Sequence, residues 1–171
     1  MNFKNLFFAA IAIVACTTSV NAQTEIKTAT ATISANIITP ITITKVSEMS
    51  FGNVVANTAG GTIVLSNDGV KSSTSLQLPA VAGTVTAASF TVTGQDGYLY
   101  TITLPTTYDI TTGGATAAET MTLSDFTNDA TNTLTGGTET FHVGATLTVL
   151  PNQTAGTYAA AAPLPVSVNY N

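Results

Sequence analysis

The sequence has no arginine and no tryptophan, a single cysteine, a single histidine and very few charged residues. Of its 171 residues, four are lysine and nine are Asp or Glu, so 8% are charged and the net charge is −5. Typical soluble domains carry roughly 25% charged residues. Nucleic-acid binding needs Lys and Arg to neutralise phosphates, and this acidic chain does not supply them. A long helical bundle is excluded too, because the heptads of Leu, Ala, Glu and Lys that it needs are missing.

The one cysteine, Cys16, lies in an N-terminal stretch with the features of an export signal. Lys4 supplies the positive start, residues 6–15 form an uncharged apolar run, and Val20-Asn21-Ala22 offers small or short residues before Gln23. This order is typical of a secretory signal peptide. We therefore predict a signal peptide over residues 1–22. The apolar run is shorter than the roughly 20 residues that cross a bilayer, so no membrane span is predicted.

An alternative reading of this region stays open. Ile13-Val14-Ala15-Cys16 resembles a bacterial lipobox, in which the cysteine becomes the lipidated first residue. Either way the chain is exported, to the extracellular space or the cell surface, with a lipid anchor through Cys16 or a periplasmic location as alternatives. Cleavage after Ala22 leaves no cysteine, and a domain of about 150 residues buries enough surface to fold without disulfides.

Threonine makes up about a fifth of the chain and alternates with apolar residues almost everywhere after Thr28. Alternation with a period of two marks strands with one buried face. Such runs cover residues 28–37, 41–44, 62–65, 89–93, 98–104, 140–143, 145–149 and 165–170, with Gly, Asn, Asp and Pro between them. Strands separated by turns at this spacing are typical of sandwiches. We predict an all-β antiparallel β-sandwich, as one domain over residues 23–171.

Three details follow from the pattern. Residues 116–126 are the best helical candidate, but Glu119 to Leu123 alternates, which favours a strand.

Pro163 and Pro165 lack N–H groups on one side of the last strand, which indicates either a sheet edge or a bend that splits the strand. The predicted core consists of Ile33, Phe51, Phe90, Val92, Ile102, Leu104, Phe141, Val143 and Leu147.

The sequence offers little that could carry catalysis. His142 lies between Phe141 and Val143, which places it on the solvent face of a strand, and a lone histidine can anchor neither a Ser-His-Asp triad nor a zinc site. Two polar clusters, Asp125, Asn128 and Asp129 in one and Asn67 and Asp68 in the other, lack the spacing of a calcium loop. The absence of Trp argues against a glycosidase. We therefore predict no enzyme, no catalytic, cofactor-binding or metal residues, and no cofactor.

Threonines two apart recur along the chain, as in Thr91 and Thr93 or Thr101 and Thr103. Some ice-binding proteins present flat threonine ladders, but these usually rest on a fixed repeat, which this sequence lacks. We interpret the threonines as solvent-facing strand residues.

Several segments together resemble a Bacteroidota family of secreted domains of unknown function, number 4402. The resemblance rests on residues 29–45 (ATATISANIITPITITK), 49–54, 88–94, 98–105, 143–147, 153–158 and 168–171. The layout is also similar to spore coat protein U domains and, more distantly, to chaperone–usher pilins. That similarity implies an immunoglobulin-like or pilin-like sandwich that a strand from another subunit can complete. Two features depart from pilins: pilins usually carry a disulfide, whereas the chain cleaved after Ala22 has no cysteine, and AAAAPLP at residues 159–165 replaces the usual alternation.

The leading functional hypothesis is a non-enzymatic secreted structural protein, a subunit of a cell-surface fibre, coat or matrix. Its expected partners are further copies or related surface subunits, joined by strand addition through residues 28–37. The alternative is a cell-surface module that binds carbohydrate or protein. In that case the N-terminal segment should pair within its own sheet and a tyrosine-lined groove should be visible.

Overall fold

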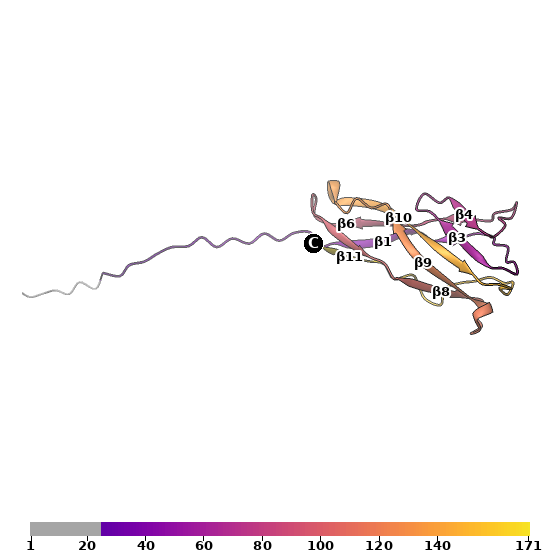
Figure 1. Ribbon diagram of the computed structural model, residues 1–171. Helices are drawn as coiled ribbons and strands as arrows, with labels where there is room; N and C mark the ends of the chain where they lie inside the picture. The colour runs from indigo at the N-terminus through magenta and orange to yellow at the C-terminus, as the bar shows by residue number, and fades with distance from the viewer. Residues whose placement is uncertain (1–24) are drawn as a thin grey trace, which may run out of the picture. The chain divides into compact units, whose positions relative to one another are not determined.

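The structure, a computed structural model, describes residues 25–171 (Figure 1). The predicted signal peptide, with Cys16 and the cleavage site after Ala22, lies outside the described residues. The chain divides at Asn36 into an N-terminal stretch and a compact unit, Ile37–Asn171, and each is described by itself. One domain over residues 23–171 stays a prediction. No helix within residues 25–171 has the length and apolar character that crossing a membrane requires.

The Ile37–Asn171 unit is an antiparallel β-sandwich, which confirms the predicted fold class. Its elements are β1 (Thr42–Ser47), β2 (Ser50–Phe51), β3 (Gly61–Leu65), β4 (Lys71–Thr74), β5 (Val85–Thr86), β6 (Ala88–Thr93), β7 (Tyr100–Thr103), β8 (Thr107–Thr111), η1 (Ala117–Glu119), β9 (Thr120–Asn128), η2 (Thr135–Gly137), β10 (Thr138–Val149) and β11 (Ser167–Tyr170). The strand interpretation of residues 116–126 is confirmed from Thr120 onward, where β9 begins, and is wrong for Ala117–Glu119, which form one 3₁₀ turn.

The long strand β10 connects the two halves of the sandwich, one built around β6 and the other around β3 (Figure 1). Its residues 138–143 pair with β6 and its residues 145–149 pair with β3, while β9 pairs along the opposite edge. Beyond these, β1 pairs with β6, β4 with β3 and β8 with β9, and β2–β5 and β7–β11 form separate pairs. At the junction, a Cβ on Gly144 would lie 2.3 Å from the Leu65 carbonyl oxygen, so a side chain would force the backbone apart.

The apolar core consists of two clusters, one in each half. The first contains Phe51, Ile63, Leu65, Leu76, Met121, Leu123, Ala145, Leu147 and Val149. The second contains Ala88, Phe90, Val92, Tyr100, Leu134, Phe141 and Val143. Met49 and Phe126 pack against both clusters. One face of β10 supplies alternate residues to both clusters, as the period of two requires.

Most of the predicted core is confirmed. Phe51, Phe90, Val92, Phe141, Val143 and Leu147 are buried. Ile102 and Leu104 are half-buried against the second cluster. The prediction is wrong for Ile33, which is 97% exposed.

Residues 25–40 form no strand, although the alternation over residues 28–37 predicted one. Ile33 and Ile37 are 97% and 96% exposed. Alternation makes a segment suitable for a sheet, but a strand also needs a neighbour to accept and donate its backbone hydrogen bonds.

The two prolines near the C-terminus split the last strand, which is the second of the two alternatives. Ala159 forms a single bridge with Thr111, and β11 begins only at Ser167. Pro163 and Pro165 lie in the irregular stretch between them, where no ladder needs their missing N–H groups.

A buried tyrosine is linked to a carboxylate on β10. Tyr100 is 1% exposed, and its hydroxyl donates to Glu139 Oε2 over 2.7 Å. The Thr131 N–H donates to Glu139 Oε1 over 2.5 Å. Partial burial alone would raise the pKa of Glu139, but these hydrogen bonds outweigh it and hold that pKa below its ordinary value. Burial raises the pKa of Tyr100, and the neighbouring carboxylate adds to that effect.

The lowered pKa of Glu139 predicts how the stability responds to acid. A carboxyl with a lower pKa in the folded than in the unfolded state stabilises the fold above its unfolded pKa, which is about 4.3. This contribution is lost as the pH falls through the folded pKa. Urea unfolding of wild type and Glu139→Gln should therefore differ most at pH 7, and the gap should shrink below about pH 4.3. A gap of constant size across that range would contradict the linkage.

Candidate functional site

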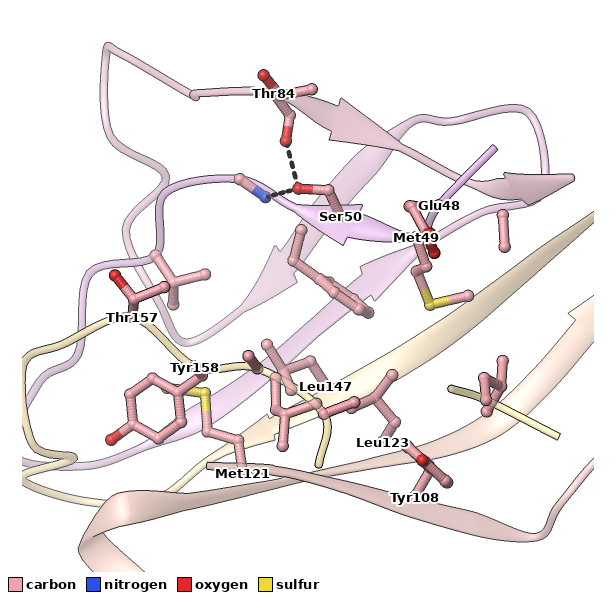
Figure 2. Close-up of a pocket in the computed structure, with 18 of the residues that line it drawn as sticks. Glu48, Met49, Ser50, Thr84, Tyr108, Met121, Leu123, Leu147, Thr157 and Tyr158 are labelled. Carbon is pink, nitrogen blue, oxygen red and sulfur yellow. Dashed lines mark hydrogen bonds between the residues drawn. The ribbon is translucent and has the colours of Figure 1, made fainter. Parts of the chain in front are cut away.

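A hollow of about 1130 Å³ opens on the first core cluster and is the candidate functional site. We call it the groove. Residues 45–56 form its first wall, residues 153–164 form its second wall, and β8, β9 and β10 supply its floor. Figure 2 shows Met49 projecting from the first wall toward Leu123 and Leu147 on the floor. Ser50 points the other way, and its hydroxyl donates to the Thr84 carbonyl oxygen over 2.7 Å.

The first wall is held in place by hydrogen bonds to its backbone. β2 pairs with β5, and the Lys71 ammonium donates to the carbonyl oxygens of Phe51 and Asn53 over 2.9 and 2.8 Å. Gly52 has a φ of +61°, and a Cβ there would lie 2.2 Å from the Ala82 carbonyl oxygen. The Phe51-Gly52 pair in the sequence therefore has a structural reason: the phenyl ring fills the core while the glycine permits a turn pressed against another loop.

The second wall depends on one buried amide, that of Gln153. Its side-chain nitrogen donates to the carbonyl oxygens of Ala118 and Thr120 over 2.7 and 2.9 Å, and its oxygen accepts the Leu150 N–H over 3.1 Å. The same nitrogen lies 3.0 Å from the Tyr158 hydroxyl. Because these groups belong to three different segments, Gln153 fixes where the second wall starts.

Further along, the second wall is attached to the edge of β8. Ala159 and Thr111 exchange backbone hydrogen bonds of 2.9 Å each. The Tyr108 hydroxyl donates to the carbonyl oxygen of Ala162 over 2.5 Å and lies 3.2 Å from that of Pro163. The wall is thus joined to β8 at a few points rather than by a continuous ladder.

The groove is apolar at its centre. Met121, Leu123 and Leu147 of the first core cluster line it. Among all its lining residues, Lys45 and Glu48 are the charged ones, and their side chains pair with each other. The charge in the groove is therefore confined to one exposed ion pair.

The residues considered for catalysis lie elsewhere, around a second hollow of about 510 Å³. His142 is half-exposed, as predicted. The Asp129 carboxylate receives both the His142 backbone N–H, over 2.5 Å, and a contact from Nδ1 at 2.9 Å. Ser89, opposite His142 on β6, has its hydroxyl 2.8 Å from that of Ser47. In the described part of the chain the hydrogen-bond partner of the His142 ring is Asp129, and no serine bonds to it.

The structure brings together two polar clusters that the sequence places far apart. Asn67 and Asp68 line the same hollow as Asp129 and His142. Asp125 instead lies at a bulge of β9 with a φ of 48°. Within residues 25–171, no three His, Cys, Asp or Glu side chains lie close enough to hold a metal ion. The sequence did not predict that Asn67 and Asp68 lie beside Asp129 and His142, because this depends on which loops the sheets bring together.

A threonine-covered face also emerges from the strand pairing. Two rows cross β1, β6 and β10, one with Thr42, Thr93 and Thr138 and the other with Thr44, Thr91 and Thr140. The hydroxyls of Thr42 and Thr93 lie 2.7 Å apart, and those of Thr91 and Thr140 lie 2.8 Å apart. These threonines are exposed or half-exposed, which confirms their interpretation as solvent-facing strand residues. Their register comes from strand pairing and needs no sequence repeat.

Comparison with known proteins gives one match, at the level of the family. No curated protein and no solved structure matched the chain. Residues 41–170, which include every strand described above, match the family described as "Domain of unknown function (DUF4402)". The chain therefore belongs to this family of domains of unknown function.

Proposed function

We propose that this protein is a non-enzymatic structural protein, a subunit of a fibre, coat or matrix at the cell surface. One observation carries the proposal: residues 28–37 have the pattern of a strand and no charge, yet they form no strand, and Ile33 is 97% exposed. An extended segment with unpaired backbone groups recruits a sheet edge from a neighbour. Subunits would then associate with each other, or with a related subunit, by adding this segment to an immunoglobulin-like or pilin-like sandwich.

Two features of the sequence support this role. The signal at residues 1–22 would direct export, with cleavage after Ala22 or lipidation at Cys16 as the two routes. The low content of charge suits close packing between subunits, because a buried unpaired charge is costly. The mass of the N-terminal peptide of the exported protein separates the two routes.

Deleting residues 23–34 tests the proposal. The compact unit begins at Ile37, so the shortened chain should keep its fold and its urea midpoint while its assembly is abolished. Sedimentation velocity at high concentration measures the assembly. A full-length protein that stays monomeric would overturn the structural role, as would a deletion that simply unfolds the sandwich.

A matched pair of point variants separates pairing from a general effect of charge. Ile33→Asp places a carboxylate on the apolar face of the segment, whereas Thr32→Asp places the same group on its polar face. Assembly should fall much more in the first variant than in the second. Equal losses would show that the two faces are not used differently.

A second candidate, a module that binds carbohydrate or protein, is favoured by the groove itself. Tyr108 and Tyr158 line it, as this hypothesis expected. However, their hydroxyls are already bonded to the carbonyl oxygens of Ala162 and Thr154. The second expectation, an N-terminal segment paired within its own sheet, is not met in the described residues.

A further inference from the structure

We propose that the threonine-covered face binds ice, an activity that goes beyond the proposed function and does not depend on it. The missing sequence repeat argued against ice binding, because a repeat is the usual source of a regular threonine ladder. The structure removes that objection. Strand pairing alone aligns the two rows on β1, β6 and β10, and hydroxyls of neighbouring strands contact each other within them.

The array is larger than those two rows. Thr146 and Thr148 lie on the same side of β10 as Thr138 and Thr140, because residues an even number apart on a strand point to one face. Two further rows pass through them and cross β4, β3, β10, β9 and β8: Thr74, Thr62, Thr148, Thr122 and Asp109 in one, and Ser72, Val64, Thr146, Ser124 and Thr107 in the other. One face of the seven-stranded sheet therefore carries hydroxyl rows in both halves of the sandwich.

This face lacks the charge that exposed protein surfaces usually carry. In these rows the residues other than Thr and Ser are Val64 and Asp109. Lys, Arg, Glu and Asp are normally prominent among exposed residues. Their long side chains would hold a solid surface away from the sheet, whereas Thr and Ser are short and end at a similar height. Close contact with a large, regular surface is therefore possible across several strands.

The composition also disfavours the other partners that a broad face could bind. Protein interfaces are enriched in aromatic residues, Met and Arg, and the rows contain none of these. The same lack of aromatic rings removes the surface on which sugar rings stack. Nucleic acid needs Lys or Arg. A lipid surface needs a broad apolar patch, whereas Val64 is the one aliphatic side chain in the rows. A partner made of water has none of these requirements.

The hydroxyls repeat in two directions with spacings that suit ice. Neighbouring strands lie about 4.7–4.9 Å apart, and residues two apart on a strand are about 6.7 Å apart. Both repeats lie close to those of the oxygen atoms on the prism face of ice. Cross-strand side-chain ladders, such as Thr91 with Thr140, also favour a flat sheet, which contact with a crystal face requires.

The paired hydroxyls can still bond to water. Each threonine hydroxyl has one donor hydrogen and two acceptor lone pairs. The contact between Thr42 and Thr93 uses one hydrogen and one lone pair, as does the contact between Thr91 and Thr140. The other hydrogen and lone pairs of these exposed or half-exposed side chains remain for water molecules at the positions of an ice lattice.

Capture by growing ice tests the inference. Ice is grown slowly on a chilled metal finger from a dilute solution of the exported protein and serum albumin, and the protein content of the ice is compared with that of the liquid. The exported protein should be enriched in the ice relative to albumin. Thr140→Lys and Thr148→Lys, one in each half of the array, should lose this enrichment, because a long charged side chain holds the face away from the crystal. Thr103→Lys is the matched control, since Thr103 is exposed on β7 outside the rows.

Ice that excludes the exported protein as fully as albumin would overturn the inference. An equal loss in Thr103→Lys and Thr140→Lys would do the same, because the effect would then come from added charge in general and not from this face. Retention on crystalline cellulose without capture by ice would replace ice with a hydroxylated polymer. The urea midpoint of each variant shows whether it is folded. Assembly by sedimentation is a separate result, which decides the proposed function alone.

Discussion

Replacing Phe141 by alanine is expected to lower the free energy of unfolding by about 3–5 kcal/mol, the usual cost of removing a buried phenyl ring. Phe141 is fully buried in the middle of the second core cluster, and its ring centroid lies 5.7 Å from that of Phe90. It belongs to β10, which both halves of the sandwich share, so its neighbours cannot easily close the cavity. The urea midpoint should fall while the m-value stays unchanged.

Thr140→Ala is the matched control for this substitution. Thr140 is the preceding residue of β10, on the exposed face, with its hydroxyl bonded to that of Thr91. Exposed substitutions usually change stability by no more than about 0.5 kcal/mol. A loss below about 1 kcal/mol for Phe141→Ala would show that the inward and outward faces of β10 are assigned wrongly.

Gln153→Leu is expected to be nearly as harmful, although it keeps the size of the side chain. Gln153 is 6% exposed, and the change removes the donor for the carbonyl oxygens of Ala118 and Thr120 and the acceptor for the Leu150 N–H. Each buried group left without a partner costs about 1–3 kcal/mol. The urea midpoint should therefore fall, and the start of the second wall should lose its fixed position.

The exposed Gln77 provides the control for Gln153. Gln77→Leu makes the same chemical change in a side chain on the surface, and its effect on the urea midpoint should be small. Similar losses in both variants would mean that leucine is unfavourable at either place for a reason unrelated to the buried amide. An unchanged urea midpoint in Gln153→Leu would show that the buried hydrogen bonds of this amide do not stabilise the fold.

The sequence predicted where the strands of the sandwich lie better than which strands pair with each other. The alternation around Phe141 and Leu147 correctly identified the inward face of β10, because a period of two follows from strand geometry alone. The two runs at residues 140–143 and 145–149 proved to be one strand that passes through Gly144. β8 was missed, although it has as many residues as β3 and Tyr108 and Ile110 alternate with polar residues in it.

The alternation of apolar and polar residues could not predict features that depend on which strands pair. Ile33 has the same alternating context as Phe141, yet it is exposed, because alternation does not state whether a neighbouring strand exists. The threonine rows on β1, β6 and β10 need a register that only the fold provides. The groove depends on the separation of two walls from distant parts of the chain, and the meeting of Asp68 with Asp129 depends on loop placement.

The continuity of β10 through Gly144 also limits how the length of this chain can vary during evolution. One extra residue just after Gly144 would turn Ala145, Leu147 and Val149 to the opposite face, while Phe141 and Val143 kept theirs. The first core cluster would lose its three side chains from β10, while the second would keep Phe141 and Val143. A substitution in β10 therefore changes one side chain, whereas an insertion or deletion there is expected to turn a whole row of core side chains to the wrong face. Changes in length are expected to be tolerated better in the connections between strands, where they leave the phase of the strands unchanged.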